Sequence, residues 1–176
     1  ATLTIDPLAW SKPPGSAGNA EAIVLMQGGA VTLIESFRIE TPDALIRGRA
    51  SEVRQNIPQR IDLTGANIGR SRFSGLLRPP AQRGTGQWII SLTGPVLDLA
   101  PVLARHEVPE PNPEESAAAQ LVARFERVLL PHQREFSALE AQVLVNRLGV
   151  MQQARINARL PERGGFTVTI TPNGQR

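Results

Sequence analysis

The sequence predicts an all-β protein whose strands form one long antiparallel meander sheet, with at most one or two short helices. Apolar and polar side chains alternate with period two along several stretches, which is typical of strands that bury one face and wet the other. Glycine and proline turns separate these stretches at intervals of about eight to twelve residues. Connections this short favour antiparallel neighbours over crossovers.

Length and composition set the limits within which such a sheet can form. The chain has 176 residues, enough for one domain with a core and for no more than two. Apolar residues make up 41% of the chain and aromatic residues only 4%, so aliphatic side chains must supply the buried surface. No stretch approaches the roughly 20 apolar residues that span a bilayer. The net charge is only +3 and the arginines are scattered, which argues against nucleic-acid binding.

The alternation is clearest at three places. Apolar side chains fall at Val31, Leu33, Phe37 and Ile39, and again at every second residue of 154–160 and of 166–170. Together with the turn residues, the pattern predicts ten strands, at 20–28, 30–40, 44–53, 59–68, 71–78, 86–93, 120–130, 136–148, 150–160 and 166–172. Strands spaced about 4.8 Å apart would then form a ribbon roughly 50 Å wide. A flat open sheet of that width is unusual, so we expect the sheet to curl.

Two segments depart from the strand pattern. The segment 98–105 is consistent with a single helical turn that begins after Asp98. The segment 113–130 starts with a proline and two acidic residues, as helices often do. A helix there would place on one face the residues Ala118, Leu121, Val122, Phe125, Val128 and Leu129. Periodicity alone slightly favours this helix over a strand at 120–130.

Three prolines interrupt the middle of the chain. Pro109, Pro111 and Pro113 make residues 106–119 a linker or a long surface loop. We therefore expect a first meander segment over 1–105 and a second one over 120–176 that continues the same sheet. The sequence begins within an alternating run and ends on turn residues, which is typical of a piece of a longer chain. Its outer strands would then offer free sheet edges for edge-to-edge self-association.

The residues that could carry chemistry form no catalytic or metal-binding pattern. His106 and His132 are the only histidines, and without a partner motif each is better explained as a structural or solvated side chain. Glu114 and Glu115 fit the first turn of a helix or a solvated loop. Ser74 lacks the preceding glycine of a nucleophile elbow. Because cysteine is absent as well, the sequence predicts no disulfide, no metal, no cofactor and no enzyme.

The apolar face of the sheet is then the feature that needs an explanation. Such a face must be covered by another layer, close upon itself, or stay open to a ligand. A closed β-sandwich or β-barrel would make it an ordinary core, in a scaffold or protein-interaction module without a lipid ligand. An open trough would instead bring its floor into contact with acyl chains. The periodicity is compatible with both.

Several short motifs are similar to those of a known family. They are IDPLAW at 5–10, LTGANIG at 63–69, WIISLTGPVLDL at 88–99, ARINARL at 154–160 and GGFTVTI at 164–170. With these motifs the chain resembles the periplasmic AsmA-like proteins of Gram-negative bacteria, and among them the YhdP-like branch. The resemblance covers most of the chain.

The resemblance implies a fold, a location and a function. It implies a sheet curled into a U-shaped β-groove, within the periplasmic part of a protein that is anchored in the inner membrane. The family has no catalytic residues and is associated with phospholipid movement between the inner and outer membrane, a part of outer-membrane biogenesis. The implied partners are phospholipid acyl chains and the neighbouring segments of the parent chain. The resemblance also favours a strand over a helix at 120–130.

The apolar register of the strands supplies the expected groove lining. A groove lined by aliphatic side chains solvates acyl chains at about 0.8 kcal/mol per buried CH₂, without directional contacts. The side chains expected to line it are Leu33, Phe37, Ile61, Leu63, Phe73, Trp88, Ile90, Leu92, Val143, Val145, Ile156, Leu160, Val168 and Ile170. For each of them, packing in an ordinary core is an equally good explanation.

Overall fold

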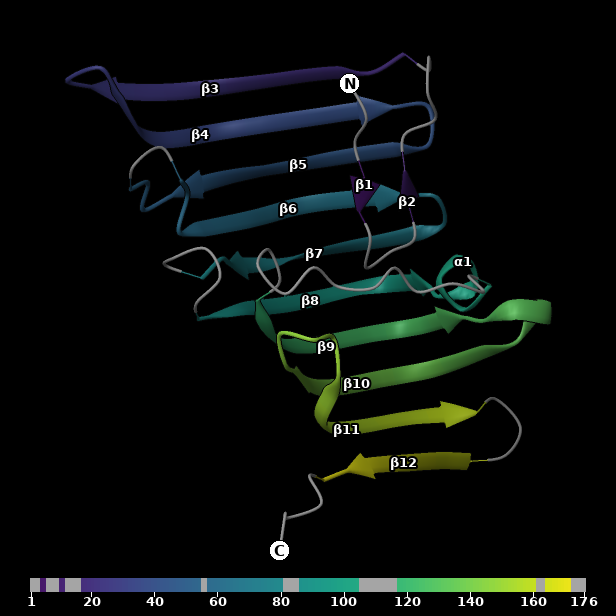
Figure 1. The fold of residues 1–176 in the computed structure, drawn as a ribbon. Helices are drawn as coiled ribbons and strands as arrows, with labels where there is room; N and C mark the ends of the chain where they lie inside the picture. Colours follow the sequence, from purple (N-terminus) through teal and green to yellow (C-terminus); the bar gives the residue numbers. More distant parts are fainter. Residues whose placement is uncertain are drawn as a thin grey trace, which may run out of the picture.

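The alternating stretches of the sequence fold into ten strands that lie side by side in one sheet (Figure 1). The computed structural model describes residues 4–5, 10–11, 17–54, 57–80, 86–104, 117–160 and 164–171. The strands of the sheet are β3 (Asn19–Gln27), β4 (Ala30–Thr41), β5 (Ala44–Ser51), β6 (Arg60–Ile68), β7 (Ser71–Arg78), β8 (Gln87–Asp98), β9 (Ala118–Leu129), β10 (Glu135–Val145), β11 (Met151–Leu160) and β12 (Gly164–Ile170). Their order in the sheet follows the sequence, from β3 at one edge to β12 at the other. The predicted fold class is therefore confirmed.

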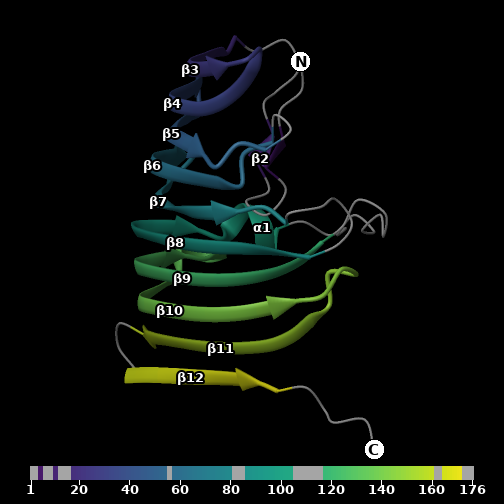
Figure 2. The same ribbon diagram turned by 90° about the vertical axis from the view of Figure 1, so that its left-hand side faces the viewer.

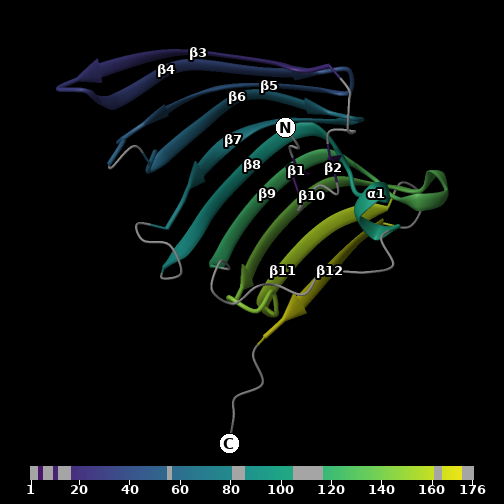
Figure 3. The same cartoon turned by 45° about the horizontal axis from the view of Figure 1, so that its top comes forward.

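Short elements accompany the large sheet. The two-residue strands β1 (Thr4–Ile5) and β2 (Trp10–Ser11) pair antiparallel with each other. The helical turn α1 (Ala100–Leu103) follows β8, where the sequence predicts one, and the 3-10 turn η2 (Pro131–Gln133) joins β9 to β10. The strands of the sheet curve around the side on which β2 and α1 lie (Figures 2 and 3). No helix among the described residues is both long and apolar enough to cross a membrane.

One strand pairing departs from the predicted antiparallel order. β9 runs parallel to β8, whereas the other pairings within the ten-stranded sheet are antiparallel. A parallel neighbour requires the chain to return along the whole length of β8 before β9 can start. The linker predicted at 106–119 lies in this return, although its residues 106–116 are outside the described residues. The expectation of antiparallel order throughout, drawn from short connections, is thus wrong at this junction.

The alternative of a helix over 113–130 is also wrong. Residues Ala118–Leu129 form β9, which pairs with β8 on one side and β10 on the other. The helix-like spacing comes from an irregularity in the strand. Phe125 and Val128 are three residues apart and both buried, while the two residues between them are exposed. Opposite them on β10, Leu139 and Phe136 show the same spacing of three.

The buried side chains come from one side of the sheet. The core cluster consists of Ala44, Ile46, Ala66, Ile68, Phe73, Leu97, Ala123, Phe125, Val128, Leu139, Ala141 and Ala158. The rings of Phe73 and Phe125 meet edge to face, with 6.4 Å between their centroids. Leu99 and Leu130 pack against the same cluster. Leu99 lies between β8 and α1, and Leu130 lies between β9 and η2. These contacts place the core toward one end of the strands.

A buried polar network fixes the place where β8 turns into α1. The carboxylate of Asp98 accepts hydrogen bonds from Nε of Arg70 (2.7 Å) and from the backbone N–H of Ala100 (3.0 Å). The backbone N–H of Asp98 donates to Oγ of Ser71 (2.9 Å). Asp98 therefore ties the turn between β6 and β7 to the end of β8 and to the start of α1.

Replacing Asp98 with alanine is expected to lower the free energy of unfolding by about 2 kcal/mol, because the backbone N–H of Ala100 and the Arg70 guanidinium lose their acceptor. Asp98→Asn should cost only about 1 kcal/mol, since the amide oxygen can still accept a hydrogen bond from the backbone. Urea unfolding of both variants measures the difference. Equal losses in the two variants would contradict this role for the carboxylate.

Candidate functional site

Strand pairing places the predicted groove residues relative to one another. Side chains of directly paired residues lie on the same face of a sheet, and successive residues along a strand alternate between faces. Two rows of paired residues cross all ten strands. The first row is Val24, Ile34, Ala50, Ile61, Leu77, Ile90, Leu121, Val143, Ala154 and Ile170, and the second is Ala22, Phe37, Gly48, Leu63, Gly75, Leu92, Ala123, Ala141, Ile156 and Val168. We call the face that carries both rows the apolar face.

Large and small residues are fitted to each other along the second row. A Cβ built on Gly48 would lie 2.6 Å from Cζ of Phe37, and one built on Gly75 would lie 2.8 Å from Cδ2 of Leu92. The large side chains therefore lie across the neighbouring glycines. In this way hydrocarbon covers the backbone even where a strand contributes no side chain.

All but one of the predicted lining residues lie on the apolar face. Nine of them are members of the two rows: Phe37, Ile61, Leu63, Ile90, Leu92, Val143, Ile156, Val168 and Ile170. Phe73, Trp88 and Val145 each stand two residues from a row member on the same strand, and Leu160 stands four residues from one. An even spacing of this kind keeps a side chain on the same face.

Leu33 is the exception. It pairs with Leu25 of β3 and directly precedes Ile34, so it lies on the opposite face. The pairing of β4 with β5 shifts register between Ile34 and Phe37, which places one extra residue in β4. Because of this bulge, Leu33 and Phe37 are on opposite faces although they are four positions apart along the strand. The expectation that Leu33 lies with the other lining residues is therefore wrong.

Six members of the first row are not among the predicted lining residues: Val24, Ile34, Ala50, Leu77, Leu121 and Ala154. Two of them, Leu77 and Leu121, stand directly beside Ile90, on either side of it. The signal for Leu121 was present in the sequence as the alternation of Leu121, Ala123 and Phe125. The helical interpretation of the same segment obscured it.

Burial divides the apolar face into a packed part and an accessible part. Phe73 is 8% exposed and belongs to the core, so it has no surface to offer a ligand. Toward the other end of the strands, five residues are only partly buried and adjoin one another through strand pairing. These are Trp88, Ile90, Leu121, Val143 and Val145, which we call the accessible patch. Val168 and Ile170 on the edge strand are 41% and 40% exposed.

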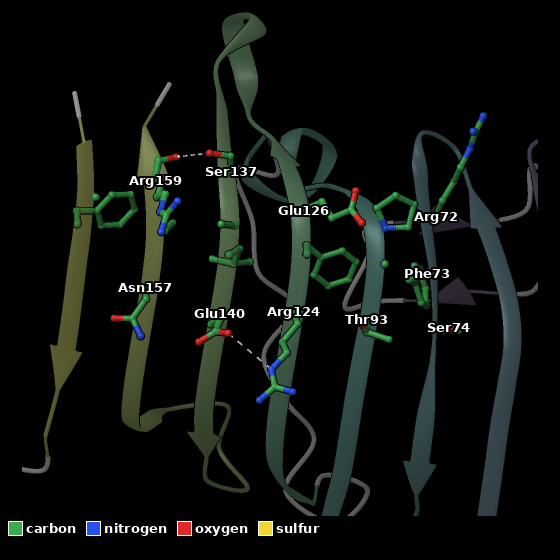
Figure 4. Close-up of a pocket in the computed structure, with 18 of the residues that line it drawn as sticks. Arg72, Phe73, Ser74, Thr93, Arg124, Glu126, Ser137, Glu140, Asn157 and Arg159 are labelled. Carbon is green, nitrogen blue, oxygen red and sulfur yellow. Dashed lines mark hydrogen bonds and ion pairs between the residues drawn. The ribbon is translucent and has the colours of Figure 1, made fainter. Parts of the chain in front are cut away.

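The opposite face of the sheet is polar. A row of directly paired residues crosses it from β7 to β12: Ser74, Thr93, Arg124, Glu140, Asn157 and Thr167. Within the row Arg124 and Glu140 lie 3.9 Å apart, and the Thr167 hydroxyl is 2.9 Å from Oδ1 of Asn157. All six residues border an open depression of about 1160 Å³, together with Arg72, Glu126 and Arg159 (Figure 4). Its lining also includes Phe73, Phe125, Leu139 and Phe166, so the depression is mixed in character, whereas the six side chains of the row suit contact with water.

On the polar face, Asp62 forms ion pairs with one arginine of β5 and one of β6. Asp62 lies 2.8 Å from Nη2 of Arg60 and 3.3 Å from Nε of Arg49. The hydrogen bond from Arg60 favours the carboxylate and holds the pKa of Asp62 below its ordinary value. The stabilisation that this brings is complete above the unfolded-state pKa of about 3.9 and is lost as the pH falls through the lower folded-state pKa. The ion pairs of this face are therefore intact at neutral pH.

Two of the residues considered for chemistry lie in the described part of the chain, and they belong to separate elements. His132 is exposed in η2, and Ser74 belongs to the polar row. His106, Glu114 and Glu115 lie outside the described residues. Within the part of the chain that the structure describes, no three His, Cys, Asp or Glu side chains form a group that could hold a metal ion.

The sheet is open. β3 and β12 are its two edges and do not pair with each other, so the alternative of a closed barrel is wrong. A sandwich is excluded as well for the described strands, because all ten longer strands belong to a single sheet. What remains is an open, curved sheet with an apolar face and a polar face.

Comparisons of the chain with known protein families, with curated proteins and with solved structures gave no match.

Proposed function

We propose that this chain is a non-catalytic segment of a bridge-like lipid-transfer protein, and that its apolar face holds phospholipid acyl chains as they move between the inner and outer membrane. The observation that carries the proposal is the pair of uninterrupted apolar rows across ten strands. An acyl chain lying across the strands would meet hydrocarbon at each step. At about 0.8 kcal/mol per buried CH₂, this attraction is non-directional, so no single position traps the chain.

The polar face and the edges of the sheet fit the same function. Phospholipid head groups would remain in water beyond the apolar rows, while the polar row from Ser74 to Thr167 keeps the other face of the sheet wet. The resemblance to the AsmA-like family supplies the setting of the proposal. In that setting the chain lies in the periplasm, in a parent protein anchored in the inner membrane, and a neighbouring segment extends the groove from the β12 edge.

A protein-interaction scaffold without a lipid ligand is the second candidate. It is favoured by the burial of Phe73, Phe125 and Val128, because this part of the apolar face already serves as a core. In such a scaffold another protein segment would cover the accessible patch. The two candidates differ in what the patch binds, and that difference can be measured.

Native mass spectrometry of the chain purified from bacterial cells without detergent tests the proposal. We expect co-purified phospholipid on the unaltered chain and its loss when Ile90 and Val145 are both replaced by aspartate, because two carboxylates in the accessible patch would make the burial of acyl chains unfavourable. Circular dichroism should show that the variant keeps its sheet.

Ile89→Asp is the matched control for this experiment. Ile89 is 46% exposed and adjoins Ile90 on the same strand, but it lies on the polar face. The control should keep its lipid. Lipid-free unaltered protein that also takes up no added phospholipid would overturn the lipid-transfer proposal and leave the interaction scaffold.

A further inference from the structure

The edge strand β3 carries exposed apolar residues on both of its faces. All nine of its residues are exposed, and Ile23 and Met26 are 59% and 61% accessible. Pairing with β4 fixes Ile23 and Leu25 on the polar face and Val24 and Met26 on the apolar face. A lipid on the apolar face would leave Ile23 and Leu25 in water. A cover for this strand must therefore reach both faces, as a neighbouring strand does.

The free edge of β3 carries neither lysine nor proline, and the extra residues at the two register shifts of its pairing with β4 lie in β4. Natural edge strands are blunted by lysine, proline, inward-pointing charges or bulges that twist the edge away. Between Asn19 and Gln27 there is no proline and no lysine, and the single charge is Glu21. The nine residues thus offer an unprotected row of backbone donors and acceptors.

We propose that β3 is an interface with a second copy of this chain, whose own β3 pairs with it antiparallel around a two-fold axis normal to the sheet. This operation turns the strand direction round but keeps both apolar faces on the same side. The two sheets then form one larger sheet with a continuous apolar face. The inference does not depend on the proposed lipid ligand.

The direction of the strands argues against the other way of joining two copies. Because β8 and β9 are parallel and the other pairings are antiparallel, β12 runs in the same direction as β3. A head-to-tail contact of β12 with β3 would therefore be a parallel pairing, which is less stable per residue. It would also continue from copy to copy as an open chain, whereas pairing of β3 with β3 is complete with two copies.

The sequence of β3 selects one register for the pair. With Val24 opposite Val24 of the second copy, Ile23 stands opposite Leu25, Ala22 opposite Met26, and Glu21 opposite Gln27. Each of these pairs joins residues on the same face, as a common sheet requires. The apolar residues of both copies meet, and the two Glu21 carboxylates do not face each other.

Cysteine cross-linking tests this register directly. The chain contains no cysteine, so Val24→Cys introduces a single thiol. Directly opposed residues have Cα atoms about 4.5–5.5 Å apart, within the range of a disulfide. We expect the variant to form an interchain disulfide under mild oxidation.

Ile23→Cys is the matched control for the cross-link. In the proposed register the two introduced thiols would be diagonal neighbours, with Cα atoms about 7–8 Å apart and beyond the usual span of a disulfide. This variant should cross-link at least roughly tenfold more slowly, although Ile23 is the more exposed residue. Equal cross-linking of the two variants would overturn the proposed pairing.

Sedimentation velocity tests the interface without a cross-link. The unaltered chain should associate to a dimer as its concentration rises from low micromolar to several hundred micromolar. The double replacement of Ile23 and Leu25 by lysine should keep it monomeric, because four lysines would then meet across the pair. Ile89→Lys, at a position that is as exposed as Leu25 but away from the edges, should leave the dimer intact. A strictly monomeric unaltered chain, or a dimer that persists with both lysines in place, would overturn the proposal.

Discussion

Replacing Gly94 with alanine is expected to lower the free energy of unfolding by at least about 3 kcal/mol, a large effect for one added methyl group. Gly94 lies in β8, directly opposite Phe125 of β9. A Cβ at this position would lie 2.7 Å from Cα of Phe73 and would also collide with the carbonyl oxygen of Arg72. Both are backbone atoms of β7, so no rotation of a side chain can relieve the contact, and β7 would have to move away from β8.

Gly65→Ala provides the control for this prediction. Gly65 lies in β6, in the interior of the same sheet, but a Cβ built there would have no neighbour within 4 Å. Its replacement should change the free energy of unfolding by no more than about 0.5 kcal/mol. Urea unfolding followed by circular dichroism measures both variants. A loss in Gly94→Ala that is no larger than the loss in Gly65→Ala would contradict the close approach of β7 and β8.

Most of the strands could be predicted because their ends carry clear turn residues. The expected strand at 71–78 coincides with β7, which lies between Gly69 and Pro79. The expected strand at 86–93 is too short, because Gly94 and Pro95 have the composition of a turn, whereas β8 continues to Asp98. The pairing of β7 with β8 shifts register beside Pro95. A bulge of this kind tolerates a residue that has no N–H to donate.

Irregularities within strands could not be predicted, because they leave little trace in the alternation. Ala138 has a φ of 51° in the middle of β10, where the pairing with β11 shifts register. A glycine or an asparagine would have indicated this conformation, but an alanine does not. The bulge in β4 misplaced Leu33 for the same reason. The irregularity at Phe125 and Val128 made β9 similar to a helix.

The sequence predicts which side chains lie on the apolar face, but it does not predict which of them are buried. A side chain's face follows from the alternation along the strand and from the pairing between strands, and both have a period of two. Burial depends on what else lies over the face. Phe73 and Trp88 have the same place in the alternation, yet Phe73 lies within the core cluster while Trp88 belongs to the accessible patch. That difference depends on how far each residue lies from the core end of the strands. The alternation of apolar and polar residues carries no information about that distance.

Replacing Phe125 with alanine is expected to lower the free energy of unfolding by about 3–5 kcal/mol, because it removes a buried ring and leaves a cavity between three strands. Phe125 is 2% exposed, its ring meets that of Phe73, and it stands opposite Leu139 and Gly94. Gly94 contributes no side chain, and Cβ of Phe73 lies 2.9 Å from the place that a Cβ on Gly94 would take. The surrounding strands, held by their hydrogen bonds, cannot collapse into the space that the ring leaves.

Phe166→Ala is the control for this prediction, because it removes a ring from the same face that is less deeply buried. Phe166 lies on the same face and makes a similar ring contact with Phe136, at 5.0 Å, but it belongs to the edge strand β12 and is only partly buried. Its replacement should cost about 1–2 kcal/mol, because less surface is returned to water and the edge can relax. Equal losses for the two phenylalanines in urea unfolding would contradict this difference, because a ring at the edge of the core cluster would then contribute as much stability as one buried between three strands.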